Sequence, residues 1–407
     1  MPNSKYKTKY LDLGFCLPAA GRDLFGSIGI IGILDLPDCA VTFDIKNMKE
    51  LVRKNILNVT PYIAGKPIEE VKRQLGLKQV IKMASNENPL GPSLKALAAI
   101  RRNLSAVNRY PDSQGYYLKK KLSKLLNLKP SCFVLGNGSD ELIDILIKTF
   151  VEDDECVMTA ETTFLEYKVI AQAAGRRIIT VPLRYFKYDL EAFKKRINKK
   201  IKLIFIANPN NPTGTYVTKY ELEEFMKDLP EHVLLVLDEA YDTFIDVDDF
   251  PSSLKYIRKK NVVVLKTFSK AYGLAGLRLG FAVAKPSLVS YMERVRQPFN
   301  VNLLAQQAGL AALDDKKFLN RTRKVVWEGK GYLYAQLKRL GLAPVPSVAN
   351  FILVDVGGDS VNIFKDMLKY GVIVRDMKQY GLNNFIRVTV GTRQENEKFI
   401  KVLKKVL

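Results

Sequence analysis

Short, continuous apolar runs alternate with amphipathic stretches along most of the chain. Runs of strand length cover residues 156–159, 178–181, 201–207, 233–237 and 262–265. Strands that are apolar throughout, rather than at every second position, are typical of a sheet buried on both faces. Helical patterns lie between them, such as 139–150, which begins with a serine and two acidic residues. The sequence therefore predicts an α/β fold with a mostly parallel central sheet flanked by helices.

The last hundred residues predict a second, smaller α/β domain. A long basic helical stretch over 314–340 precedes a strand-like run at 351–356, a helix near 361–370, and strand-like runs at 373–375 and 385–390. We therefore divide the chain into four parts. They are an extension of unknown role (1–45), an arm that contributes to the small domain (46–85), a large domain (86–305) and the small domain (306–407).

Composition narrows the class and the compartment. No apolar run among the 407 residues approaches the roughly 20 that a membrane span needs. Three lysines precede an apolar run at 15–20, as in a signal peptide, but charged residues interrupt the pattern. The four cysteines, Cys16, Cys39, Cys132 and Cys156, form no CxxC pair. We therefore expect a cytoplasmic protein without a metal site or disulfides.

The chain is strongly basic, with 64 basic and 42 acidic residues and a net charge of +22. Such a balance suits a polyanion partner such as nucleic acid, or it reflects a general enrichment in lysine. The basic residues are dispersed in short runs without a basic tail, which favours enrichment over nucleic-acid binding. A small phosphorylated substrate would also suit local positive charge.

Four polar segments follow predicted strands. In open α/β sheets, ligands bind beyond the carboxyl ends of the strands, so these segments are predicted to share one site. The segments are Gly-Asn-Gly-Ser-Asp-Glu at 136–141, Asn-Pro-Asn-Asn-Pro-Thr-Gly at 208–214, Asp-Glu-Ala-Tyr at 238–241 and Ser-Lys-Ala-Tyr-Gly-Leu-Ala-Gly-Leu-Arg at 269–278.

Each segment has a chemical interpretation and a plainer one. The glycines at 136–138 would let a phosphate approach the start of the next helix, or they simply form a turn. Asp238 ends an apolar run and would need a positive partner, such as a protonated ring nitrogen, unless it only caps a helix. An asparagine in 208–214 would donate a hydrogen bond, or the segment is only a turn. Lys270 follows a buried strand, where desolvation would make it a usable amine, with Arg278 near enough to clamp a phosphate.

These requirements converge on pyridoxal phosphate, which needs a lysine, an acid at its ring nitrogen, donors to its ring oxygen and a phosphate pocket. Three further motifs are Asn-Glu-Asn-Pro at 86–89, Arg-Tyr-Pro-Asp at 109–112 and Ile-Arg-Val-Thr-Val-Gly-Thr at 386–392. With them the chain resembles the fold-type I aminotransferases that use pyridoxal phosphate, and among these the histidinol-phosphate aminotransferase family. The resemblance runs from about residue 45 to the C-terminus.

The resemblance implies roles for particular residues. Lys270 would form an imine with the cofactor and move a proton, Asp238 would pair with the pyridinium nitrogen, and Phe164 would stack on the ring. Asn211 and Tyr241 would hydrogen-bond the ring oxygen. The implied phosphate-binding residues are Gly138, Ser139, Asp140, Ser269, Arg278 and, from the other subunit of a homodimer, Tyr110. The implied substrate-binding residues are Tyr62, Asn350, Arg375 and Arg387. The family's usual proline before the stacking aromatic ring is missing here, where Thr162 and Thr163 precede Phe164.

The implied reaction converts L-histidinol phosphate and 2-oxoglutarate to imidazole acetol phosphate and L-glutamate, in histidine biosynthesis. Two arginines suit both a phosphate and a carboxylate, so one pocket would serve both half-reactions. Within the same fold, an aromatic amino-acid aminotransferase and a threonine-phosphate decarboxylase are alternatives. A nucleic-acid-binding protein is the alternative from a different class.

Overall fold

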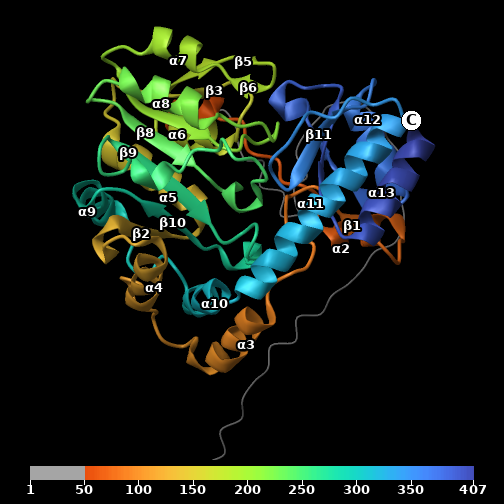
Figure 1. Cartoon of the computed structure of the whole chain (residues 1–407), viewed down its shortest axis with the longest axis horizontal. Helices are drawn as coiled ribbons and strands as arrows, with labels where there is room; N and C mark the ends of the chain where they lie inside the picture. Colours follow the sequence, from red (N-terminus) through yellow and green to blue (C-terminus); the bar gives the residue numbers. More distant parts are fainter. Residues whose placement is uncertain (1–50) are drawn as a thin grey trace, which may run out of the picture. The chain divides into compact units, whose positions relative to one another are not determined.

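The computed structural model describes residues 51–407 (Figure 1). The predicted extension at 1–45, with its signal-like run and with Cys16 and Cys39, lies outside the described residues. Among the residues that are described, no helix is both long enough and apolar enough to cross a membrane.

A seven-stranded sheet forms the centre of the larger part of the fold. Its strand order is β2-β10-β9-β8-β7-β3-β4, and only β10 runs antiparallel to its neighbours. The strands are β2 (Phe133–Gly136), β3 (Cys156–Ala160), β4 (Arg177–Val181), β7 (Ile201–Ala207), β8 (Leu234–Asp238), β9 (Val262–Thr267) and β10 (Gly280–Val283). The prediction of a mostly parallel buried sheet is confirmed.

Helices cover both faces of this sheet, which explains why its strands are apolar throughout. One face packs on α5 (Gly138–Phe150), α6 (Glu166–Ala173) and α9 (Pro286–Val295). The other packs on α3 (Leu94–Asn103), α4 (Tyr116–Leu126), α7 (Leu190–Arg196), α8 (Lys219–Lys227) and α10 (Leu303–Leu313). Alternate residues of one strand enter the two cores: Leu235 and Leu237 of β8 join one, and Leu234 and Val236 the other.

A second core surrounds a three-stranded antiparallel sheet of order β11-β14-β13. Its strands are β11 (Phe351–Asp355), β13 (Arg375–Asp376) and β14 (Phe385–Thr389), and its helices are α11 (Lys316–Arg339), α12 (Ser360–Lys369) and α13 (Arg393–Val406). Helix α13 packs against both the long α11 and α12, at the C-terminal end of the chain (Figure 1). This helix begins at Lys316, not at residue 314, because the Asp315 side chain caps it by accepting the amide of Phe318.

The predicted strand at 373–375 is two strands with different partners. Val372–Ile373 (β12) pairs in parallel with Ile81–Lys82 (β1), whereas Arg375–Asp376 pairs with β14. The pairing of β12 with β1 and the packing of α2 (Ile68–Leu75) attach residues 68–84 to this second core. The four-part division of the chain, with its boundary at 305, stays a prediction.

The remaining elements are short. A two-residue hairpin joins β5 (Leu183–Arg184) to β6 (Lys187–Tyr188). The 3-10 helices are η1 (Ile56–Asn58), η2 (Leu104–Ala106), η3 (Pro130–Cys132), η4 (Asp242–Phe244), η5 (Ser253–Lys255), η6 (Ala275–Leu277) and η7 (Lys378–Tyr380).

Candidate active site

A cavity of about 450 Å³ lies at the carboxyl ends of β7, β8 and β9. This is the edge at which an open α/β sheet binds its ligands, and the volume suits a small cofactor with a substrate. Most of the residues singled out from the sequence line it: Tyr62, Ser139, Asp140, Phe164, Asn211, Asp238, Tyr241, Ser269, Lys270, Arg278 and Arg387. The fold thus brings all four polar segments together, as predicted.

Lys270 lies three residues beyond β9, with its amine in the cavity. Its Nζ donates a hydrogen bond to the carbonyl oxygen of Ser85 (3.0 Å) and lies 5.7 Å from the centre of the Tyr241 ring. Desolvation, helped by the positive charge of Arg387, lowers the pKa of Lys270 to about 8. A substantial fraction of this amine is therefore neutral near physiological pH and able to act as a nucleophile.

Asp238 ends β8 and is almost fully buried. Its Oδ2 accepts a hydrogen bond from the Tyr167 hydroxyl (2.6 Å), and its Oδ1 accepts one from the amide of Ala240 (3.1 Å). Burial raises the pKa of Asp238 to about 6, although these two hydrogen bonds act in the opposite direction. Asp238 is therefore a buried acid and not a helix cap, because the next helix, η4, has Tyr241 at its N-cap and the Ala240 contact only shapes a local turn. A cation bound in the cavity would stabilise the ionised carboxylate.

Tyr241 and Asn211 are oriented by neighbours that leave donors for the cavity. The Tyr241 hydroxyl accepts a hydrogen bond from Asn86 Nδ2 (3.0 Å), so its own hydrogen is available to another acceptor. Asn211 Oδ1 accepts a hydrogen bond from Arg387 Nη1, so the Asn211 amide nitrogen remains a donor. Two donors therefore stand at one wall of the cavity, where a ring oxygen would accept them.

An anion pocket lies at the start of α5. Gly138 has a φ of +82°, which favours glycine, and a Cβ there would lie 2.4 Å from Arg278 Nη2, so a larger residue would displace the guanidinium. Arg278 pairs with Asp140 (2.8 Å) and contacts the Ser269 hydroxyl (3.5 Å). Asn137, at the N-cap, makes no side-chain cap, so the first helical amides keep their donors. Amides, a hydroxyl and a guanidinium together suit a phosphate.

Arg387, on β14, is the second arginine that lines the cavity, besides Arg278. It donates to the carbonyl oxygen of Ala84 (2.6 Å) and to Asn211. Its buried Nε has no hydrogen-bond partner among residues 51–407. An unpaired buried guanidinium nitrogen is costly, which favours an anionic ligand here.

Arg375 and Asn350 are buried but do not line the cavity. Arg375 donates to the carbonyl oxygen of Ile63 (2.6 Å) and to Gln379 Oε1 (3.0 Å), and its guanidinium lies 5.3 Å from the centre of the Tyr62 ring. Asn350 donates to the carbonyl oxygen of Asn86 (3.1 Å). Arg375 therefore contacts Tyr62, and Asn350 contacts Asn86, and both of these partners line the cavity. Direct contact of Arg375 or Asn350 with the substrate stays a prediction.

Tyr110 also lies away from the cavity. Its side chain is 82% exposed and stacks on Phe299, with the ring centres 4.6 Å apart. Tyr110 is predicted to bind the cofactor phosphate in the cavity of a second copy of the chain, and this role stays a prediction.

The stacking loop keeps its aromatic ring in place without the expected proline. Phe164 lines the cavity and meets Tyr167 edge-on, with ring centres 5.5 Å apart. Thr162 stands where the family has proline, and its carbonyl oxygen accepts a hydrogen bond from Asn210 Nδ2 (3.1 Å). The Thr163 hydroxyl donates to Asn210 Oδ1 (2.8 Å). Side-chain hydrogen bonds therefore hold this loop beside the segment that carries Asn211.

Sequence reasoning missed several residues of the site. Ser85, Asn86, Glu87, Glu166, Tyr167 and Thr267 all line the cavity. Asn86 and Glu87 belong to the Asn-Glu-Asn-Pro motif, for which the sequence alone predicts no role. The positive φ of Asn86 (55°) is uncommon for a residue other than glycine. Tyr167 gave no signal, because an aromatic residue within a helix normally reads as core.

These features fit pyridoxal phosphate. The cavity offers an amine of lowered pKa, a buried acid, two donors, an aromatic wall and an anion pocket. An open α/β sheet with this set of groups at its carboxyl edge is the arrangement of the fold-type I pyridoxal-phosphate enzymes. The sequence profile of the family "Aminotransferase class I and II" matches residues 78–403, and the chain belongs to this family.

Known relatives within the family are histidinol-phosphate aminotransferases. That of Moorella thermoacetica is 48% identical over 357 residues, which cover 87% of this chain and 92% of that protein. That of an Anaeromyxobacter species is 46% identical, covering 88% of this chain and 99% of that protein. The crystal structure of the Sinorhizobium meliloti histidinol-phosphate aminotransferase in complex with pyridoxal-5'-phosphate matches with a TM-score of 0.81 at 29% identity, covering 87% of this chain and 97% of that one.

Proposed function

We propose that this protein is a pyridoxal-phosphate-dependent aminotransferase acting in histidine biosynthesis. It would convert L-histidinol phosphate and 2-oxoglutarate to imidazole acetol phosphate and L-glutamate. The observation that carries the proposal is Lys270, an amine with a pKa of about 8 in the cavity that also holds Asp238 and the anion pocket. The identity of 48% to a histidinol-phosphate aminotransferase supports the choice of substrate.

The cofactor, when bound, withdraws electrons from the substrate carbon next to the reacting nitrogen. Asp238 would keep the ring nitrogen protonated, because its buried carboxylate gains from a nearby cation. Tyr241 and Asn211 would donate to the ring oxygen, and Phe164 would cover one face of the ring. The amides of Ser139 and Asp140, the Ser269 hydroxyl and Arg278 would hold the phosphate.

Lys270 would serve both as the attachment point and as the group that moves a proton to and from the substrate carbon. Its lowered pKa suits both tasks, because the neutral amine is a nucleophile and a base. Arg387 would bind the anionic end of each substrate through its guanidinium group, which lines the cavity. The proposal places Tyr62 beside it in the substrate pocket, braced by Arg375.

The proposal extends to the assembly, the compartment and the partners. Tyr110 lies exposed outside its own cavity, which suits a residue that completes the cavity of a second subunit in a homodimer. We keep a cytoplasmic location and the absence of a nucleic-acid partner as parts of the proposal.

The substrate can be tested in a single half-reaction. The purified, cofactor-loaded protein is mixed with histidinol phosphate, tyrosine or threonine phosphate without any oxo acid, and the visible cofactor absorbance is followed. We expect histidinol phosphate to bleach the absorbance fastest, with no release of carbon dioxide. Bleaching by tyrosine alone would indicate an aromatic amino-acid aminotransferase. Carbon dioxide released from threonine phosphate would indicate the decarboxylase.

A further inference from the structure

A side chain from a distant loop holds both sides of the turn between β2 and α5. Asn300 Nδ2 donates to the carbonyl oxygen of Leu135 in β2 (3.1 Å) and to Glu141 Oε2 in α5 (2.6 Å). One amide group therefore joins the strand that enters the Gly-rich turn to the helix that leaves it.

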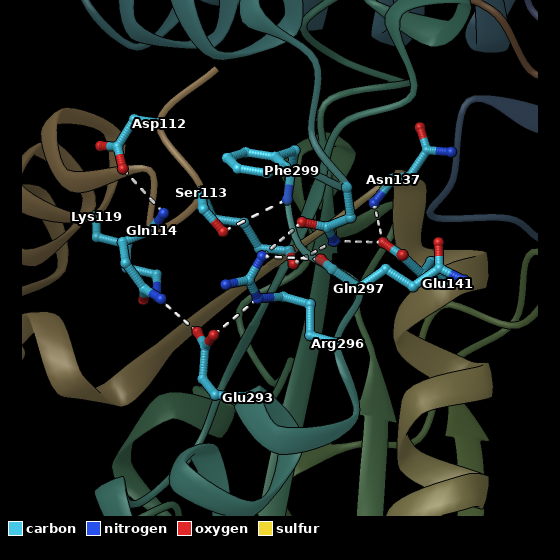
Figure 2. Close-up of polar contacts among 12 residues, drawn as sticks. Asp112, Ser113, Gln114, Lys119, Asn137, Glu141, Glu293, Arg296, Gln297 and Phe299 are labelled. Carbon is cyan, nitrogen blue, oxygen red and sulfur yellow. Dashed lines mark hydrogen bonds and ion pairs between the residues drawn. The ribbon is translucent and has the colours of Figure 1, made fainter. Parts of the chain in front are cut away.

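Glu141 in turn occupies the first free amide of this turn. Its Oε2 accepts a hydrogen bond from the backbone nitrogen of Asn137 (2.6 Å), which Figure 2 shows directly. The amides that follow, at Ser139 and Asp140, belong to residues that line the cavity. Carboxylates favour helix N-termini, so a Glu141 that was not held would compete with a phosphate for these amides and repel it. The hydrogen bond from Asn300 instead holds the Glu141 carboxylate at the backbone amide of Asn137.

Charges on either side set the orientation of the Asn300 amide. Its Oδ1 accepts a hydrogen bond from Arg296 Nη1 (2.8 Å), opposite the nitrogen that faces Glu141. Arg296 is 9% exposed and is held by Glu293 (2.7 Å), which also binds Lys119 (2.6 Å) (Figure 2). An asparagine between a cation and an anion has one favourable orientation, so this chain of contacts is preorganised.

We propose that Asn300 and Glu141 are positioning residues that shape the turn at 136–138 to receive the phosphate group of the cofactor. They act through the backbone amides at the start of α5 and do not themselves line the cavity. This inference rests on the proposed function, because it takes the anion pocket to be the phosphate site of pyridoxal phosphate.

The test compares two ligands that differ only in the phosphate. Full-length protein freed of cofactor is titrated with pyridoxal phosphate and, separately, with pyridoxal, and binding is followed by visible absorbance. We expect Asn300→Ala to weaken pyridoxal phosphate roughly tenfold, the worth of a hydrogen bond to a charged group, and pyridoxal by less than about twofold. Glu141→Ala should behave likewise. Glu141→Gln, which keeps the acceptor, should restore most of the affinity.

A matched control separates positioning from general destabilisation. Asn261 also bridges a carbonyl oxygen, that of Glu231 (2.6 Å), and a cation, Lys285 (2.5 Å), but it lies before β9, away from the cavity. Asn261→Ala should leave both affinities unchanged. Unchanged binding of pyridoxal phosphate by Asn300→Ala and Glu141→Ala would overturn the inference. An equal loss of affinity for pyridoxal phosphate and for pyridoxal would also overturn it. If Asn300→Ala did not fold, Glu141→Ala alone would decide by the same two criteria. Failure of the wild-type protein to bind pyridoxal phosphate would instead refute the proposed function.

Discussion

At the scale of single residues, the site depends on charged groups held in places that cost stability. Asp238 is 5% exposed, and its hydrogen bonds from Tyr167 and Ala240 do not fully offset the loss of solvation. The carboxyl group therefore binds a proton more tightly in the folded protein than in the unfolded chain. A cationic ring nitrogen would relieve this cost, so the same group that destabilises the empty protein would favour the loaded one.

Replacement of this acid gives a prediction with a defined sign. The pKa of Asp238 rises from 3.8 to about 6 on folding, so the cofactor-free protein loses stability from this group as the pH rises through that window. Relative to the wild type, the free energy of unfolding of Asp238→Asn should therefore increase between pH 4 and pH 7, by on the order of 2 kcal/mol. Urea unfolding of both proteins at each pH measures the difference. A difference that stays constant with pH would contradict the raised pKa.

Residue-level prediction succeeded where a polar side chain interrupts an apolar pattern. Asp238 and Lys270 each stand at or just beyond the end of a buried strand, and the cost of burial alone suggested a function for them. Tyr167 could not be found in this way, because its ring packs on Phe205 like any core residue and only its hydroxyl reaches Asp238. The Arg375 contact with Ile63 joins residues more than 300 positions apart, and no local pattern reports it.

At the scale of elements, the anion pocket depends on how closely β10 approaches the start of α5. A Cβ at Gly280, the first residue of β10, would lie 2.8 Å from the carbonyl carbon of Gly138 and from the backbone nitrogen of Ser139. Both atoms are backbone, so neither a rotamer change nor a small side-chain shift would relieve the clash. The glycine thus sets the spacing between the strand and the phosphate-binding turn.

Gly280→Ala should therefore displace this turn. We expect a loss of about 1–3 kcal/mol in the free energy of unfolding, as in other overpacked cores, with weaker binding of pyridoxal phosphate. Gly331→Ala is the control, because a Cβ at this exposed position in α11 meets nothing within 4 Å and alanine favours a helix. This control should be neutral or stabilising in thermal unfolding. A Gly280→Ala protein as stable as the wild type would show that the turn tolerates displacement.

The elements themselves were predictable in proportion to their length and burial. The five longest strands of the central sheet appeared as apolar runs. In β3, β7, β8 and β9 both faces are largely buried, whereas the edge strand β4 is only partly buried. The four-residue β2 was predicted only through the polar segment that follows it, and the four-residue β10 was too short to distinguish from neighbouring turns. The division of 372–376 into β12 and β13 depends on partners at residues 81–82 and 386–387, which the local sequence does not contain.

At the scale of the whole molecule, the site draws on both cores. Lys270 and Asp238 come from the large sheet, whereas Arg387 comes from β14 of the small one. The net charge of +22 does not account for the buried lysine and aspartate of the cavity. The catalytic proposal explains those residues, which the alternative of a nucleic-acid-binding protein leaves without a role.

A homodimer that shares its sites predicts complementation. Tyr110→Ala and Lys270→Ala should each inactivate the protein. Tyr110→Ala removes a side chain that completes the site of the partner subunit, and Lys270→Ala removes the attachment point of the cofactor. Mixing the two variants under conditions of subunit exchange should restore roughly a quarter of the wild-type activity, since random pairing leaves one intact site in each mixed dimer. An assay of the mixture, with gel filtration as the control for assembly, checks this. Persistent inactivity despite exchange would place both residues in the same subunit's site.

The central claim is a covalent bond between Lys270 Nζ and the aldehyde of pyridoxal phosphate, and reduction with borohydride tests it most directly. The account predicts that reduction fixes the cofactor on one peptide, with the label at Lys270, and that Lys270→Ala carries none. Because the pKa of Lys270 is lowered to about 8, attachment to cofactor-free protein should quicken as the pH rises through 8, well below the range of an ordinary lysine. A label on another lysine, or none at all, would contradict the account.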